Sequence, residues 1–159
     1  MNYPQITHVL SDVDGVLTDG GMYYTESGDE FKKFSVYDGM AFVILKENGI
    51  KTGILTAEDR QLNRRRADKL KLDYHFHGVK DKLQFMEQFC ARNKVSLNDV
   101  GYLGDDRNDL ELLKEVGVCA CPANAIKEVK AVPNIHLLKK TGGTGALREF
   151  VNEVLGLPN

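Results

Sequence analysis

The stretch Ser11-Asp12-Val13-Asp14-Gly15-Val16-Leu17-Thr18-Asp19-Gly20 decides the fold, because it follows directly on the short apolar run 6–10. That run predicts a buried β-strand. Asp12 and Asp14 are two positions apart, so in an extended chain their side chains point to the same side. Two crowded carboxylates repel each other unless a cation compensates, and Mg²⁺ prefers such oxygen ligands. Gly15 would let the backbone approach a phosphate group.

A second acidic stretch, Gly104-Asp105-Asp106-Arg107-Asn108-Asp109, follows the predicted strand 100–103. Asp105 is expected at the same metal ion as Asp12. Asp106 and Asp109 fall three apart in the first turn of a predicted helix, on one face. Aspartate also caps helix N-termini, so for Asp106 capping remains an equal alternative. Two acidic clusters after two strands are nevertheless hard to explain by capping alone.

Two further residues fit a site for a phosphate group. Thr56 ends the predicted strand 51–56, and its hydroxyl could bond a phosphate oxygen. Lys82 lies near the start of a predicted helix, where a cation opposes the helix dipole. A local rule broken in this way indicates function, although a lone lysine is more often a solvated surface residue.

Short apolar runs alternate with helical patterns along the whole chain, which predicts an α/β fold with a doubly wound parallel sheet and helices on both faces. Ligands bind such sheets at the carboxyl ends of the strands. We expect one domain over residues 1–159, with a β-hairpin flap at about 21–34. The predicted strands are 6–10, 51–56, 74–76, 100–103, 118–121 and 135–138, and the predicted helices are 38–48, 59–71, 80–92, 106–115, 125–129 and 144–155.

Composition is that of an ordinary globular domain, with 42% apolar and 28% charged residues in 159. A net charge of −2 gives no general attraction to nucleic acid. No apolar run approaches the length of a membrane helix, and the N-terminus does not follow the pattern of a signal peptide. The three cysteines are odd in number and not spaced like a zinc site, so a reducing, cytoplasmic setting is expected.

Taken in order, the Asp12-Val-Asp14 pair, Thr56, Lys82 and the Asp105–Asp109 cluster resemble the four motifs of the haloacid dehalogenase superfamily. The resemblance implies phosphoryl transfer through an aspartyl phosphate with Mg²⁺ as cofactor. It implies that Asp12 is the nucleophile and Asp14 the general acid and base. The implied metal ligands are Asp12, the backbone carbonyl of Asp14, and Asp105; Thr56 and Lys82 would bind the phosphate, and Asp109 would orient Lys82 or metal-bound water.

Three stretches resemble more closely the capless branch that hydrolyses phosphates of 2-keto-3-deoxy sugar acids. They are residues 12–20, Phe34-Ser-Val-Tyr-Asp-Gly39 and Gly142-Gly-Thr-Gly-Ala-Leu-Arg-Glu149. The eight-carbon (octulosonate) enzymes typically have Thr-Gly-Arg or Ser-Gly-Arg where this chain has Thr56-Ala57-Glu58. An acidic residue there resembles the nine-carbon branch, so we expect the 9-phosphate of 2-keto-3-deoxynononate as substrate. The octulosonate 8-phosphate and N-acetylneuraminate 9-phosphate remain alternatives.

Glu58 can accept hydrogen bonds from sugar hydroxyls but cannot bind the sugar carboxylate. For that role, the basic run 64–69 offers Arg66 and Lys69, three apart on one helix face, or they are simply solvated. Asp38, in the 34–39 stretch, is a further candidate for substrate contact. The Gly142–Gly145 loop either closes on the site or is a flexible helix entry.

The gaps between Asp14 and Thr56 (41 residues) and between Thr56 and Lys82 (25 residues) leave no room for a cap domain. The site would be open, so we expect a homo-oligomer, a tetramer by the resemblance, in which a neighbouring subunit covers it. The alternatives are a receiver-type phospho-acceptor domain, a non-catalytic oligomerisation module, or a mutase or phosphotransferase on the same scaffold. No nucleic acid or membrane partner is expected.

Overall fold

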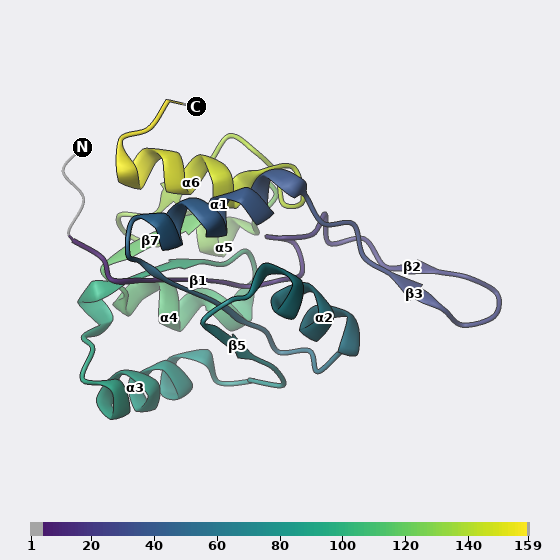
Figure 1. Ribbon diagram of the computed structural model, residues 1–159, viewed down its shortest axis with the longest axis horizontal. Coiled ribbons are helices and arrows are strands. Elements are labelled where there is room, and N and C mark those ends of the chain that lie inside the picture. Colours follow the sequence, from purple (N-terminus) through teal and green to yellow (C-terminus); the bar gives the residue numbers. More distant parts are fainter. Residues whose placement is uncertain (1–4, 159) are drawn as a thin grey trace.

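The computed structural model, which describes residues 5–158, has a six-stranded parallel sheet covered by helices on both faces (Figure 1). The strands of this sheet are β1 His8–Ser11, β4 Lys51–Leu55, β5 Tyr74–Phe76, β6 Val100–Leu103, β7 Val118–Cys121 and β8 His136–Leu137. The helices are α1 Val36–Glu47, α2 Gln61–Leu70, α3 Lys82–Asn93, α4 Leu110–Glu115, α5 Lys127–Lys130 and α6 Ala146–Leu155, with 3₁₀ turns at Leu97–Asp99 and Arg107–Asp109. The predicted doubly wound fold is confirmed.

The strand order is β5-β4-β1-β6-β7-β8, so the chain builds outward from β1 first on one side and then on the other. β1 lies between β4 and β6, with His8 opposite both Lys51 and Val100. The direction of winding therefore reverses beside β1. In open parallel sheets this reversal leaves a crevice at the carboxyl ends of the strands, where ligands bind. Both acidic stretches begin at this point.

Two apolar cores hold the helices against the sheet. Neighbouring residues of β1 face opposite cores: Val9 packs with α1, α2 and α6, whereas Leu10 packs with α3, α4 and α5. Figure 1 shows α1 and α6 side by side above the sheet, with α3 and α4 on the opposite side. Because both faces are covered, the central strands β1, β6 and β7 are buried along their whole length. Among the residues that the structure describes, no helix is long and apolar enough to cross a membrane.

Asp73 ties the start of β4 to the turn before β5. Its carboxylate accepts hydrogen bonds from the Lys51 ammonium and from the Thr52 amide and hydroxyl, each at 2.9 Å. Burial alone would raise the pKa of Asp73, but these hydrogen bonds lower it to about 2. The charged form of Asp73 is therefore a stabilising element of the sheet edge.

Several predicted helix starts are wrong by about two residues. Helix α1 begins at Val36 rather than Asp38, because the Ser35 hydroxyl caps it by accepting from the Tyr37 amide. Helix α3 begins at Lys82 rather than residue 80, since Asp81 caps it. Helix α6 cannot begin before Ala146, because Gly145 has a φ of +103°, in the left-handed region.

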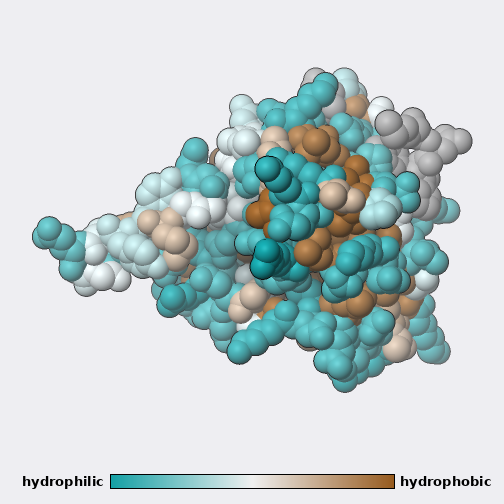
Figure 2. All heavy atoms as spheres, turned by 180° about the vertical axis from the view of Figure 1, so that it is seen from behind, coloured by the Kyte–Doolittle hydropathy of each residue, from teal (hydrophilic) through white to brown (hydrophobic). Residues whose placement is uncertain are grey.

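The segment predicted as one helix over 106–115 consists of the 3₁₀ turn Arg107–Asp109 followed by α4. The predicted hairpin is present as β2 Tyr23–Tyr24 and β3 Glu30–Phe31, which pair antiparallel. It projects from the body of the molecule (Figures 1 and 2). No cap domain is inserted within residues 5–158.

Candidate active site

Asp12 lies where β1 ends, buried at 5% exposure against β6. The Asp12 amide donates to the Leu103 carbonyl at 2.9 Å, and one carboxylate oxygen accepts from the Val13 amide at 2.7 Å. These bonds fix the direction of the carboxylate. Burial raises the pKa of Asp12 to about 7, although Lys82 opposes that shift.

Lys82, the first residue of α3, is 1% exposed and points at this carboxylate. Its ammonium lies 3.1 Å from Asp12 and 2.6 Å from Asp109, and donates to the Tyr102 hydroxyl at 3.1 Å. Burial alone would lower the pKa of Lys82, but the two carboxylates raise it. A buried cation is thus held directly beside the Asp12 carboxylate.

Asp109 connects this cation to the second acidic stretch. Its fully buried carboxylate accepts four hydrogen bonds: on Oδ1 from Lys82 and from Tyr102 at 2.7 Å, and on Oδ2 from the amides of Asp105 and Asp106 at 2.9 and 3.2 Å. Both oxygens are therefore already used by the protein. We interpret Asp109 as a residue that positions Lys82 and Asp105 rather than as a metal ligand.

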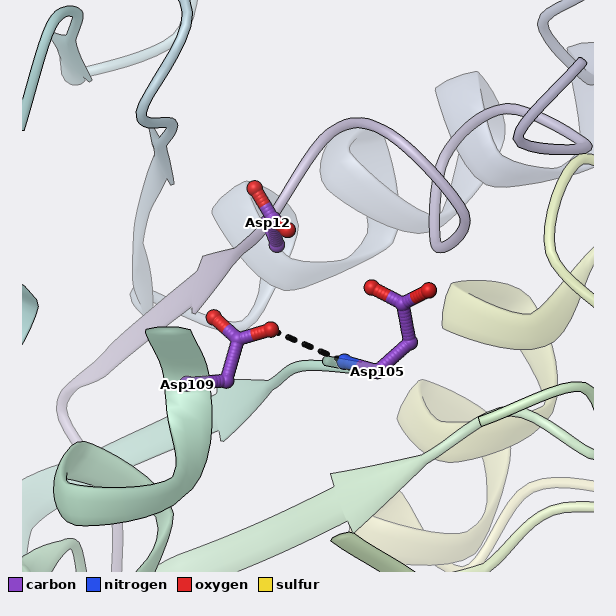
Figure 3. Close-up of side chains that lie close together, drawn as sticks. All are labelled: Asp12, Asp105 and Asp109. Carbon is purple, nitrogen blue, oxygen red and sulfur yellow. Dashed lines mark hydrogen bonds between the residues drawn. The ribbon is translucent and has the colours of Figure 1, made fainter. Parts of the chain in front are cut away.

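Asp12, Asp105 and Asp109 each contribute a carboxylate oxygen to one cluster, and these atoms all lie within 4.8 Å of one another (Figure 3). Oδ1 of Asp105 is buried and has no hydrogen-bond partner among residues 5–158. Burial, together with repulsion from Asp12 and Asp109, raises the pKa of Asp105 to about 8. Repulsion among these carboxylates opposes their ionising together, and a bound divalent cation would relieve it and displace their protons. The free oxygen of Asp105 is a ligand atom available to such a cation.

Gly15 makes room for this cluster. A Cβ at position 15 would lie 2.0 Å from Oδ2 of Asp105, and the residue has a φ of +84°. Only glycine satisfies both conditions. The sequence predicts that Gly15 lets the backbone approach a phosphate group. The structure shows that Gly15 also leaves room for the Asp105 carboxylate.

A pocket of about 190 Å³ opens beside the cluster. Asp106 was predicted as either a site residue or a helix cap, and it is placed for both. It lines the pocket, and its carboxylate caps the 3₁₀ turn by accepting from the Arg107 amide. Thr56 is 1% exposed and its hydroxyl accepts from the Glu58 amide at 3.2 Å. The structure thus brings the predicted acidic residues, the Thr56 hydroxyl and the predicted substrate-binding residue Glu58 to one pocket. The residues that line it are Asp12, Asp14, Met22, Thr56, Ala57, Glu58, Asp105, Asp106 and Asn108.

Three substrate candidates are not among the residues that line this pocket. Asp38 instead accepts from the Arg148 amide at the start of α6, and burial raises its pKa to about 6. Arg66 donates to the Ser35 carbonyl at 3.0 Å and lies over the Phe34 ring. Lys69 is exposed on α2. Within one chain, none of these side chains reaches the acidic cluster.

The Gly142–Gly145 loop packs against the Asp12–Gly20 loop. Asn124 donates to the Gly15 carbonyl at 2.9 Å and accepts from the Gly142 amide at 2.7 Å, and the Gly143 amide donates to the Val16 carbonyl at 3.1 Å. A Cβ at position 142 would lie 2.0 Å from that Gly15 carbonyl. The glycines therefore allow two backbone segments to pack directly.

Sequence reasoning missed two residues. Tyr102 lies on β6 as an apparent core aromatic, yet its hydroxyl binds Lys82 and Asp109. Lys32, just after β3, reaches from the hairpin to Asp14 and Glu58. Period-two alternation was the available signal for Lys32, since it places Lys32 and Lys33 on opposite faces of the hairpin.

The model of the haloacid dehalogenase-like hydrolase family matches residues 76–145. The 3-deoxy-D-manno-octulosonate 8-phosphate phosphatase of Haemophilus influenzae is 33% identical over 150 residues, covering 94% of this chain and 83% of that protein. Its counterpart from Yersinia pestis is 32% identical, covering 92% of this chain and 78% of that protein.

Solved structures agree with the sequence relatives. The Moraxella catarrhalis octulosonate 8-phosphate phosphatase, in complex with magnesium, phosphate and the sugar acid, superposes with a TM-score of 0.91 at 34% identity, over 96% of this chain and 87% of that one. The cobalt-bound Haemophilus influenzae enzyme gives 0.89 at 33% identity, over 96% and 88%. Family membership rules against the receiver-type alternative, and similarity to phosphatases over more than nine-tenths of this chain rules against the non-catalytic module. The chain belongs to the haloacid dehalogenase-like hydrolases and is a phosphatase of the octulosonate 8-phosphate phosphatase type.

Proposed function

We propose that this protein is a magnesium-dependent phosphomonoesterase that hydrolyses the phosphate of a 2-keto-3-deoxy sugar acid through an aspartyl phosphate on Asp12. The observation that carries the proposal is the buried Asp12 carboxylate, held beside Lys82 and the free oxygen of Asp105 at the mouth of a pocket. The 159 residues would act as one domain in the cytoplasm, with the hairpin as a flap.

In this proposal Asp12 attacks phosphorus while Lys82 and the Thr56 hydroxyl bind the phosphoryl oxygens. Mg²⁺, held by Asp12, the Asp14 carbonyl and Asp105, would offset the negative charge of the phosphate. Asp14 gives a proton to the leaving oxygen as the P–O bond breaks. It then takes a proton from the water that attacks the aspartyl phosphate and restores Asp12.

Glu58 supports the nine-carbon acid, 2-keto-3-deoxynononate 9-phosphate, as substrate. It lines the pocket and is half-exposed, so its carboxylate can accept from sugar hydroxyls. The octulosonate 8-phosphate is the second candidate, because relatives that cover most of this chain carry that name. N-acetylneuraminate 9-phosphate is the third. No basic residue lines the pocket within residues 5–158, so Arg66 and Lys69 would contact the sugar carboxylate from a neighbouring subunit.

Phosphate release with Mg²⁺ from these three substrates tests the proposal, with Asp12→Asn as the blank. We expect kcat/KM to be highest for the nononate 9-phosphate. Glu58→Arg should shift the ratio of kcat/KM values toward the octulosonate by about 10-fold or more, since an unmatched polar group in a site is strongly discriminating. Glu26→Arg makes the same charge change in the exposed hairpin turn and should leave the ratio unchanged. An unchanged ratio in Glu58→Arg would refute the role of Glu58.

We also propose that the protein is a homotetramer in which a neighbouring subunit covers the site. The support is a group of exposed apolar side chains on the hairpin and along one face of α1, which single soluble domains rarely leave uncovered. They are Met22, Tyr23, Tyr24, Phe31, Val36, Tyr37, Met40 and Val43.

Sedimentation velocity at micromolar concentration tests the assembly, with the tetramer as the expected species. Met40→Arg should shift it toward smaller species, whereas Leu137→Arg, which charges a similarly exposed residue on β8, should not. A monodisperse monomer for the parent protein would contradict the proposal.

A further inference from the structure

Lys32 is a buried cation that none of the motifs includes. Its ammonium lies 2.7 and 2.9 Å from the two carboxylate oxygens of Asp14 and 2.7 Å from Oε2 of Glu58. The ammonium donates a hydrogen bond to Oδ2 of Asp14 and another to Oε2 of Glu58, so it binds both carboxylates at once. The Lys32 side chain is 1% exposed, whereas those of Asp14 and Glu58 are 32% and 36% exposed. The cation therefore lies beneath two carboxylates that both face the pocket.

The position of Lys32 in the chain makes this contact informative. It belongs to the hairpin, 18 residues after Asp14 and 26 before Glu58, so three separate segments meet at one ammonium group. The hairpin has a second, weaker link to this region, because Arg60 lies 3.7 Å from Glu30. Anchoring of the hairpin alone would not require Lys32 to hold both oxygens of Asp14.

We propose that Lys32 is a positioning residue for proton transfer: it holds the Asp14 carboxyl toward the leaving oxygen and links it to Glu58 at the sugar-binding end of the pocket. This inference rests on the proposed role of Asp14. As the P–O bond breaks, its electron pair stays on the leaving oxygen, and Asp14 gives its proton to that oxygen. The Lys32 ammonium keeps its own protons and stabilises the carboxylate that results.

A series of substituted aryl phosphates tests the proposal without involving sugar recognition. An oxygen that leaves easily, as in p-nitrophenyl phosphate, needs little proton donation, whereas that of phenyl phosphate needs more. The kcat/KM value reports the steps up to the departure of the leaving group. Lys32→Met should therefore lower kcat/KM for phenyl phosphate by about 10-fold more than for p-nitrophenyl phosphate, as part of the 10²- to 10⁴-fold that an acid contributes.

Lys33→Met is the matched control, because it removes the same charge from the exposed neighbouring position. It should leave the dependence on leaving group unchanged. Asp14→Asn should steepen the dependence more than Lys32→Met does. The double variant Lys32→Met/Glu58→Gln removes the Lys32 ammonium together with the Glu58 carboxylate. Asp14 then loses its cation while the net charge of the group stays the same. Thermal melts check that each variant folds.

The outcomes separate two failures. If Lys32→Met and the double variant lower kcat/KM equally for every aryl phosphate while Asp14→Asn steepens the dependence, Lys32 serves only the fold and the inference is wrong. If Asp14→Asn leaves the dependence unchanged, Asp14 is not the proton donor, and the inference falls together with that part of the proposed function.

Discussion

Replacing Asp109 by asparagine should lower the free energy of unfolding more than any other isosteric substitution in the site. Asp109 offers Oδ1 to Lys82 and Tyr102 and Oδ2 to two backbone amides. An asparagine keeps only one oxygen. Whichever way its amide turns, one pair of these buried donors faces an NH₂ group and loses its acceptor.

The magnitude follows from those contacts. A buried hydrogen bond to a charged group contributes about 1.5 to 3 kcal/mol, and a neutral one about 1 kcal/mol. Lys82 also loses one of its two carboxylates, and breaking a buried ion pair on one side costs about 3 to 5 kcal/mol. We therefore expect Asp109→Asn to lower the free energy of unfolding by about 3 to 5 kcal/mol.

Urea unfolding at pH 7 in EDTA, followed by circular dichroism, measures this change without a contribution from bound metal. Asp106→Asn is the control, because Asp106 is exposed and asparagine caps a helix as well as aspartate does; its loss should stay below about 0.5 kcal/mol. A loss under about 1 kcal/mol in Asp109→Asn, or equal losses in both variants, would refute the reasoning.

Two further predictions concern the metal cluster and the sheet edge. Gly15→Ala should weaken Mg²⁺ binding by about 10- to 100-fold in titration calorimetry, because its Cβ would lie 2.0 Å from Oδ2 of Asp105. Gly28→Ala is the control, since Gly28 also has a positive φ (+90°) but nothing lies within 4 Å of its added Cβ; equal affinities would contradict the role of Gly15. Asp73→Asn should cost about 1 to 2 kcal/mol at pH 7, a value discounted for partial exposure. The pKa of Asp73 in the folded protein, about 2, lies below the ordinary aspartate value of 3.8, so its contribution is present above about pH 4 and is lost as the pH falls through 2. A difference between the two proteins that persists in full in urea melts at pH 2 would contradict it.

Much of the site could be predicted because it depends on strand ends. In a parallel sheet the carboxyl ends of β1, β4 and β6 lie together, so Asp12, Thr56 and Asp105 converge once the alternation of elements is recognised. Lys82 could be predicted from its unfavourable place at a helix start. These inferences need only the local periodicity and the topology.

The residues that escaped prediction depend on contacts between distant segments. Lys32 and Lys33 are chemically identical neighbours, and only the path of the returning hairpin strand brings one of them to Asp14. The sequence predicts Asp38 as the first residue of its own helix, but its carboxylate accepts a hydrogen bond from the Arg148 amide near the start of α6, 110 residues away. The α1 start itself was set by the Ser35 cap, a local signal that the acidic residue obscured.

The most direct test of the central claim is to identify the phosphorylated residue. The protein with Mg²⁺ and the sugar acid phosphate that it hydrolyses best would be quenched in acid within one turnover, reduced with borohydride and sequenced by tandem mass spectrometry. An acyl phosphate on Asp12 is reduced to homoserine, so we predict homoserine at position 12, dependent on substrate and absent from Asp12→Asn. Homoserine at another aspartate, or none while phosphate is released at the full rate, would contradict the account.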